Sequence, residues 1–183
     1  MSKIIVISGT AGTGKSYLAK NLAEKFNSSF LSIGKIAREN AKKMGLSIYQ
    51  YQRLCETNPE IDRQLDSDFV HSVLHQDGCV IVDYRLGAYF FPNAFKIYLK
   101  TDVDEVVRRL RERDEDLQDK TDEQIKELVN FRVNSARNRL RELYDFDFTD
   151  ERNYDLVIDN TDLTPEQTLE KVLIAIKTYF CKS

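Results

Sequence analysis

The feature that most constrains this chain is the passage from an apolar run to a glycine-rich loop and then to an amphipathic segment, within residues 3–26. Residues 3–8, KIIVIS, are typical of a buried strand, and residues 15–26 carry apolar side chains at helical spacing. The loop between them, GTAGTGKS, covers residues 9–16. Because glycine adopts backbone conformations that other residues avoid, successive N–H groups of such a loop can turn inward toward an anion at the positive end of the following helix. The stretch therefore predicts a phosphate-binding turn.

The loop matches the pattern G-x-x-x-x-G-K-[ST] at Gly9, Gly14, Lys15 and Ser16. In this pattern the lysine reaches the outer phosphates of a nucleoside triphosphate, and the hydroxyl ligates Mg²⁺. The alternative is a tight strand-to-helix turn that contains glycine for its shape alone. With a strand before it and a helix after it, the loop predicts binding of ATP and Mg²⁺. The residues expected to contact ATP here are Gly9, Thr10, Ala11, Gly12, Thr13, Gly14, Lys15 and Ser16.

Strand-like and helix-like segments alternate along the rest of the chain. Further strands are expected at residues 28–33, 79–85, 95–100 and 154–160, and further helices at 34–45, 58–78, 103–114, 121–144 and 164–180. Each strand is apolar throughout, which predicts an α/β fold with a parallel sheet covered by helices on both faces. Ligands of such sheets bind at the carboxyl ends of the strands. The glycine loop, DYR at residues 83–85 and DNTD at residues 159–162 all fall there.

Asp83 ends the apolar strand CVIVD and is the candidate carboxylate for the metal. A carboxylate at this strand end can hold a water of the Mg²⁺ shell, so Ser16 and Asp83 are the predicted metal residues. The alternative is a carboxylate that caps the next turn. No second carboxylate follows Asp83, and no N-K-x-D segment for reading guanine is present. Both features favour phosphoryl transfer to a bound acceptor.

Several arginines are candidates for neutralising transferred phosphate, because a planar guanidinium bonds two phosphate oxygens at once. Those selected are Arg85, Arg109, Arg113, Arg132 and Arg139. The last four form two pairs, four and seven residues apart, so the members of each pair share a helix face. The polar stretch at residues 114–121 separates the pairs and suits a mobile lid. Solvated helix faces are the alternative for both pairs, and a structural salt bridge is the alternative for Arg85.

Taken together, these segments resemble the nucleoside monophosphate kinases, and within them the short cytidylate kinases of the archaeal type and their bacterial relatives. The resemblance spans residues 3–176 and rests on GTAGTGKS, SIGKIARE, NPEIDRQLD, DYRLG, RRLRER, RVNSARNR, LYDFD and YDLVID. It implies a three-layer P-loop kinase fold with a five-stranded parallel sheet, in a single domain over residues 1–183. It also implies a monophosphate-binding helical insert at residues 34–76 and a lid at 114–121. The implied reaction converts ATP and CMP, or dCMP, to ADP and CDP, or dCDP, with Mg²⁺.

The resemblance also implies roles for individual residues. Arg109 is expected over the adenine or its phosphates, and Arg113 on the transferred phosphoryl group. Asn160 and Thr161 are expected beside the adenine. The resemblance places Ser32 and Gly34 near the acceptor and Arg38 on its phosphate, and the position of Arg85 at the end of a strand independently predicts an acceptor phosphate as its partner. The catalytic residues so implied are Lys15, Arg85, Arg109, Arg113, Arg132 and Arg139.

A second group of residues is expected to contact the acceptor base. Asp62 and Asp66 are four apart and share a helix face, so they can accept hydrogen bonds from an amino group such as cytosine N4. Pairing with arginines is the alternative. The family often has glycine where this chain has Tyr84, whose ring is expected either to stack on a base or to narrow the acceptor site. The aromatic run at residues 89–92 either walls the same pocket or packs in the core.

The composition of the chain limits the kinds of partner that are expected. The net charge of -3 argues against nucleic acid as a partner, and no apolar stretch approaches the ~20 residues that span a bilayer. The three cysteines lie far apart and are expected to be reduced thiols in a cytoplasmic protein, a monomer or weak oligomer. Two other functions stay open. One is a kinase of another acceptor, namely UMP, AMP, shikimate or gluconate. The other is a non-catalytic ATP sensor, which would need no lid arginines.

Overall fold

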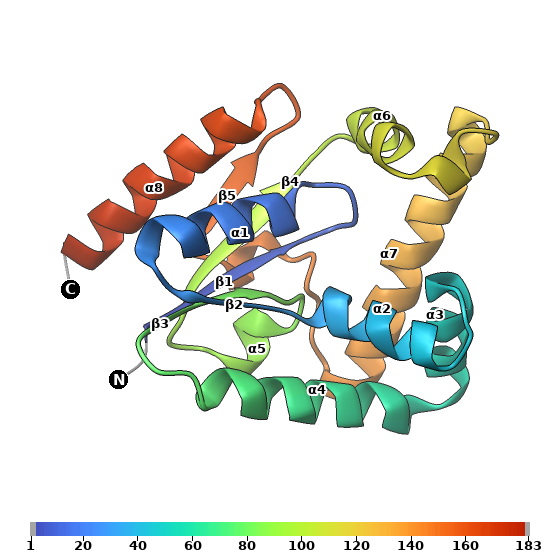
Figure 1. The fold of residues 1–183 in the computed structure, drawn as a ribbon, viewed down its shortest axis with the longest axis horizontal. Helices are drawn as coiled ribbons and strands as arrows, with labels where there is room; N and C mark the ends of the chain where they lie inside the picture. Colours follow the sequence, from blue (N-terminus) through green and yellow to red (C-terminus); the bar gives the residue numbers. More distant parts are fainter. Residues whose placement is uncertain (1–2, 182–183) are drawn as a thin grey trace.

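The computed structural model describes residues 3–181 as a parallel sheet between two layers of helices (Figure 1). The sheet order is β2-β3-β1-β4-β5, and every neighbouring pair is parallel. The strands are β1 (Lys3–Gly9), β2 (Ser29–Ser32), β3 (Cys79–Asp83), β4 (Phe95–Lys100) and β5 (Leu156–Asp159). The predicted α/β class and the five-stranded parallel sheet are confirmed.

Alternate residues of the central strand supply two separate cores, one on each face of the sheet. Ile5 and Ile7 pack with α1 (Lys15–Phe26) and α8 (Pro165–Cys181), whereas Val6 packs with α4 (Pro59–Leu74) and α7 (Asp122–Tyr144). A strand buried on both faces must be apolar at every position, which is why β1 reads as a continuous hydrophobic run. Figure 1 shows α1 and α8 on one side of the sheet and α4 on the other.

The connection from β2 to β3 is a helical unit of three elements, α2 (Ile33–Lys43), α3 (Ile48–Thr57) and α4. The sequence analysis assigns no element to residues 46–57, but the structure places α3 there. Its start is a capping box, in which Ser47 Oγ accepts from the Gln50 backbone N–H at 3.2 Å and Gln50 Oε1 accepts from the Ser47 N–H at 2.8 Å. This S-x-x-Q signature is visible in the sequence and is the signal that was missed. The predicted insert at residues 34–76 therefore contains one more helix than expected.

The connection from α6 (Val103–Arg113) to α7 passes through a short 3₁₀ turn, η1 (Glu115–Leu117). Leu117 is buried against Leu110 and Ile125, so the predicted lid at residues 114–121 is anchored to both helices by one apolar side chain. A short helix, α5 (Gly87–Phe90), and a 3₁₀ turn, η2 (Glu151–Asn153), complete the described elements. No helix within residues 3–181 has the length and apolar character needed to cross a membrane.

Candidate functional site

The loop between β1 and α1 is shaped by glycines whose backbone conformations require them. Gly14 is the residue before the first turn of α1 and has φ 86°, in the left-handed region. A Cβ on Gly9 would collide with the backbone oxygen of Leu99 on β4. The Asn160 side-chain amide, from the end of β5, donates to the Thr13 carbonyl at 3.0 Å. The loop is therefore held in one shape, with the N-terminus of α1 open toward its concave side, as an anion site requires.

Lys15 lies half-buried within this loop and donates from Nζ to the Thr10 carbonyl. Burial lowers the pKa of Lys15 from 10.5 to about 8. Asp83 opposes this shift of the pKa, whereas Arg85 and Arg132 add to it. The ammonium group thus sits among other cations with too little negative charge nearby, which is the environment that a phosphate would complete.

Ser16 and Asp83, the predicted metal residues, are brought together by the sheet. Ser16 Oγ donates to Asp83 Oδ2 at 2.9 Å, and Asp83 is 8% exposed. A hydroxyl and a carboxylate at this spacing supply the oxygen ligands that Mg²⁺ prefers, and they leave room for water and phosphate oxygens in the remaining positions. Ser32 also donates to Asp83 Oδ2, at 3.2 Å, so this residue supports the carboxylate.

A cavity of about 630 Å³ opens in front of the loop, within the size range of small-molecule sites. Most residues predicted from the sequence to form the site line it. They are Ala11, Gly12, Gly14, Lys15, Ser16, Gly34, Arg38, Asp62, Asp66, Asp83, Tyr84, Arg85, Arg109, Arg113, Arg132 and Arg139. The other predicted residues, which do not line the cavity, are Gly9, Thr10, Thr13, Ser32, Asn160 and Thr161.

We use the name insert wall for the side of the cavity that α2, α3 and α4 form. Its residues are Ile33, Gly34, Ala37, Arg38, Ile48, Tyr51, Gln52, Cys55, Asp62, Leu65 and Asp66. The opposite side is formed by the glycine loop and α6. The cavity therefore lies between the predicted ATP site and the helical unit that the sequence analysis assigns to the acceptor.

The arginines of the cavity differ in how they are held. Arg38 and Arg113 are exposed and form no hydrogen bond or ion pair within residues 3–181. Arg109 donates from Nε to Glu105 Oε1 at 2.7 Å and from Nη2 to the Asn160 backbone carbonyl at 2.8 Å. The second hydrogen bond joins Arg109 to the end of β5. Two of the arginines are thus free to follow a ligand, and one is positioned in advance beside the residues predicted for adenine.

Arg85 lies at the end of β3, over the ring of Phe148 at 5.3 Å. The pKa of Arg85 is lowered from 12.5 to about 10, mainly by burial and secondly by the charge of Arg132. Within residues 3–181 no carboxylate lies close enough to form an ion pair with its guanidinium. The structure therefore does not contain the salt bridge that was the alternative for this residue.

Arg132 and Arg139, seven residues apart on α7, both face the cavity as their spacing predicts. Arg139 donates from Nε to Asp62 Oδ2 at 2.7 Å and from Nη1 to Ser135 at 2.6 Å. Arg132 has a buried Nε without a hydrogen-bond partner, and burial lowers the pKa of its guanidinium. Arg139 therefore forms an ion pair with Asp62, whereas Arg132 forms no ion pair within residues 3–181.

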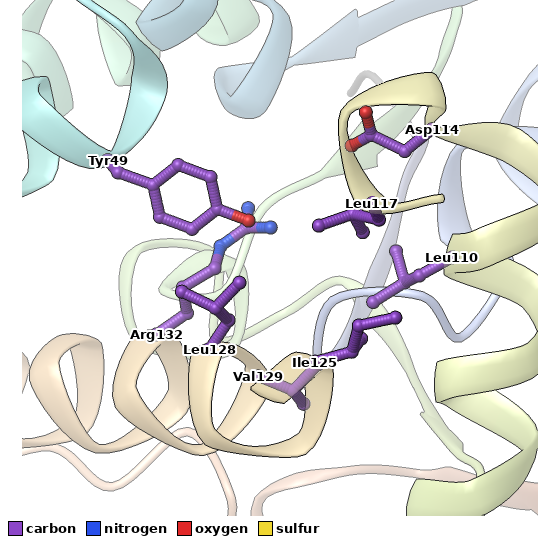
Figure 2. Close-up of a pocket in the computed structure, with 8 residues that line it drawn as sticks. All are labelled: Tyr49, Leu110, Asp114, Leu117, Ile125, Leu128, Val129 and Arg132. Carbon is purple, nitrogen blue, oxygen red and sulfur yellow. The ribbon is translucent and has the colours of Figure 1, made fainter. Parts of the chain in front are cut away.

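Tyr49 is a residue that the sequence analysis did not consider. Its ring lies 5.5 Å from the Arg132 guanidinium carbon, and Figure 2 shows the two side chains meeting at the edge of a small pocket. This pocket holds about 10 Å³ and is lined mainly by apolar residues of α6, η1 and α7. Tyr49 belongs to α3, so its contact with Arg132 joins the insert to the long helix that follows the predicted lid.

The two aspartates predicted at the base already have partners. Asp62 holds Arg139, and Asp66 accepts from the Tyr84 hydroxyl at 2.6 Å and from the Tyr144 hydroxyl at 2.8 Å. Burial raises the pKa of Asp66 to about 6, against the opposing effect of the two phenols. Each carboxylate oxygen has two lone pairs, so a further donor can still bind.

Tyr84 occupies the position where a glycine was expected from the resemblance. It is 2% exposed, and its ring packs edge-on against Phe69 with centroids 4.9 Å apart. The ring therefore forms part of the cavity floor, and no free face is left for stacking on a base. Tyr89 and Phe90 pack against Tyr144 and do not line the cavity. Phe90 packs against the core, whereas Tyr89 is 44% exposed.

Comparison with known proteins agrees with this geometry. The cytidylate kinase-like family matches residues 4–162. The cytidylate kinase of Sulfolobus acidocaldarius is 34% identical over 171 residues, which cover 92% of this chain and 91% of that protein. The cytidylate kinase of Methanosarcina mazei is 31% identical over 175 residues, covering 94% of this chain and 95% of that protein.

A third relative bears a different name. The S-adenosylmethionine-dependent nucleotide dehydratase of Lacinutrix mariniflava is 37% identical over 175 residues, which cover 94% of this chain. The match spans only 36% of that longer protein.

Solved structures show the same fold at low sequence identity. The shikimate kinase from Bacteroides thetaiotaomicron has a TM-score of 0.64 and 18% identity, covering 96% of this chain and 98% of that one. TT1252 from Thermus thermophilus has a TM-score of 0.62 and 18% identity, covering 97% of each chain. The P-loop kinase fold expected from the sequence is therefore confirmed. With the loop, the sheet order and the match to residues 4–162 in agreement, the chain belongs to the cytidylate kinase-like family.

Proposed function

We propose that this protein transfers the γ-phosphoryl group of ATP to a nucleoside monophosphate, and that the acceptor is CMP or dCMP. Family membership supports nucleotide kinase activity in general. The observation that carries the proposal is the convergence of seven cationic side chains on one cavity in front of the phosphate loop. They are Lys15, Arg38, Arg85, Arg109, Arg113, Arg132 and Arg139. A site that seats two phosphorylated molecules end to end needs this excess of positive charge.

The proposed roles follow the two sides of the cavity. The glycine loop and Arg109, with Asn160 and Thr161 behind them, bind ATP. The insert wall binds the acceptor, with Arg38 and Arg139 directed to its phosphate. Residues 114–121 act as the lid that brings Arg113 over the phosphates. Lys15, Arg85 and Arg132 stabilise the negative charge of the transferring group.

The proposed reaction needs no covalent intermediate with the protein. An ionised acceptor phosphate is already nucleophilic, so one of its oxygens attacks the γ-phosphorus, the bond from that phosphorus to the bridging oxygen breaks, and ADP leaves. No general base is needed. Ser16 and Asp83 would hold Mg²⁺, which supplies charge neutralisation on the phosphates when bound. The chain's own contribution is to hold the two phosphates in line and to exclude water.

Release of ADP tests the proposal. The purified protein is incubated with ATP, Mg²⁺ and one acceptor at a time: CMP, dCMP, UMP, AMP, shikimate, gluconate or none. Stimulation by CMP or dCMP above all others is the expected result. Stimulation by a different acceptor would move the protein to another substrate, and ATP binding without stimulation by any acceptor would favour a sensor.

A further inference from the structure

The segment between α7 and β5 contains one buried aromatic side chain, Phe148, and the chain is fixed on both sides of it. Before it, Asp147 Oδ2 accepts from Arg137 Nε at 2.8 Å. After it, the Tyr154 hydroxyl donates to the Phe148 backbone carbonyl at 2.7 Å. The same hydroxyl is hydrogen-bonded at 3.0 Å to Ser8 Oγ, in β1 just before the glycine loop. Phe148 is 0% exposed, so packing and these hydrogen bonds hold its ring in one position.

This ring lies under the Arg85 guanidinium, whose carbon is 5.3 Å from the ring centroid. Within residues 3–181 the guanidinium forms no hydrogen bond and no ion pair. The charge of Asp83 acts on it from beyond ion-pair distance, and Asp83 Oδ2 already accepts from Ser16 and Ser32. Among the described residues, the ring is therefore the one specific partner of the Arg85 guanidinium.

A ring holds an arginine differently from a carboxylate. A carboxylate neutralises the guanidinium and occupies its donors, whereas an aromatic face attracts the cation and carries no net charge. Arg132 also lies over a ring, that of Tyr49, at 5.5 Å. Arg109 and Arg139, in contrast, form ion pairs with carboxylates. An arginine held by a ring therefore keeps its charge for a ligand.

The donors of Arg85 stay accessible to such a ligand. Arg85 lines the cavity, and none of its nitrogens is among the fully shielded polar atoms without a partner within residues 3–181. The charge of Arg85 lowers the pKa of Lys15, so the two cations act on the same part of the cavity.

We infer that Phe148 is a positioning residue whose ring holds Arg85 in the cavity and leaves the charge of the guanidinium available to the transferring phosphoryl group. Because Phe148 is braced to β1, the contact also fixes Arg85 relative to the glycine loop that follows this strand. The inference rests on the proposed function, since the transferring group is the ligand that is assigned to Arg85 there.

The test is a double-mutant cycle on kcat, measured with ATP and the acceptor that stimulates ADP release most. Phe148→Leu removes the ring and keeps the site apolar, so it should lower kcat about 10-fold while changing each KM less than about 3-fold. In the Arg85→Ala background the same substitution should lower kcat less than about 2-fold, because the ring then has no guanidinium to hold. Phe95→Leu, in the core on the opposite face of the sheet, is the matched control and should leave kcat unchanged.

A second series keeps the ring and does not depend on whether Phe148→Leu folds. Phe148 is replaced site-specifically by phenylalanines that carry one, two or five ring fluorines. These fluorines weaken the attraction of the ring for a cation in steps and change its size little. The value of kcat should fall in that order, and the same series at Phe95 should have no effect.

Three outcomes would overturn the inference: an unchanged kcat in Phe148→Leu, an equal loss in the wild-type and Arg85→Ala backgrounds, or a kcat that does not depend on the number of fluorines. If no acceptor stimulates ADP release, the proposed function fails, and calorimetric titration of the same four proteins with ATP then decides the inference. A loss of ATP affinity of at least about 3-fold in Phe148→Leu that is absent in the Arg85→Ala background would support it. An unchanged affinity, or an equal loss in both backgrounds, would contradict it.

Discussion

Lys15→Met is expected to stabilise the ligand-free protein while removing its activity. The pKa of Lys15 is lowered from 10.5 to about 8, first by burial. Between pH values of about 8 and 10.5 the unfolded chain binds more protons than the folded one, so the free energy of unfolding rises with pH across this range. Below this range the folded protein bears the full cost of keeping the buried ammonium group charged. At pH 7 the cost is about 3 kcal/mol. Methionine removes this cost but also removes the hydrogen bond from Lys15 to the Thr10 carbonyl, which costs about 1 kcal/mol, while Thr13 Oγ1 remains a donor to that carbonyl.

The net gain for Lys15→Met is therefore about 2 kcal/mol at pH 7. Urea unfolding measures it, with Lys20→Met as a control on the exposed side of the same helix. Raising the pH to 9.5 should reduce the gain by about 2 kcal/mol, because the wild-type lysine then loses its charge in the folded state. A variant less stable than the wild type at pH 7, or a gain that does not depend on pH, would refute the reasoning.

Three further predictions follow from the cavity. Burial raises the pKa of Asp66 from 3.8 to about 6, so stability should fall by about 2 kcal/mol as the pH rises from 4 to 6, and Asp66→Asn should abolish this slope in urea titrations; an equal slope in the variant would contradict it. Asp83→Asn keeps an oxygen for Ser16 but loses the charge, and it should raise the Mg²⁺ concentration for half-maximal activity at least about tenfold; an unaltered requirement would count against the metal role. Tyr49→Ala removes both the ring and the hydroxyl that contact Arg132 and should lower kcat about fivefold, whereas Tyr49→Phe removes only the hydroxyl and should lower kcat less; an unchanged kcat in Tyr49→Ala would argue that the contact is incidental.

Local patterns were enough to predict the glycine-loop side of the cavity. The glycine spacing of residues 9–16 requires a particular backbone, and that requirement can be recognised without knowing the rest of the fold. Helical periodicity likewise separates the arginines of α7. Arg132 and Arg139 face the cavity, whereas Arg137 and Arg141 form ion pairs with Asp147 outside it.

The contacts of the insert wall could not be predicted in the same way, because they join distant parts of the chain. Asp62 meets Arg139 and Asp66 meets Tyr144 across 77 and 78 residues, and no periodicity in one sequence reports such pairs. Ser32 was placed at the acceptor but donates to Asp83. The cavity-lining residues of α3 were not predicted because this helix was not predicted, although the capping box that begins it could have revealed it.

The central claim is that one cavity seats two nucleotides with their phosphates in contact. The most direct measurement is the affinity of a single molecule in which adenosine and cytidine are joined through their 5′ oxygens by five phosphates, compared with ATP and CMP alone. Joining the two ligands makes the second binding step intramolecular, so the linked molecule should bind at least about 100-fold more tightly than either nucleotide. An affinity no higher than that of ATP would contradict the claim, because the two halves would then not occupy one continuous site.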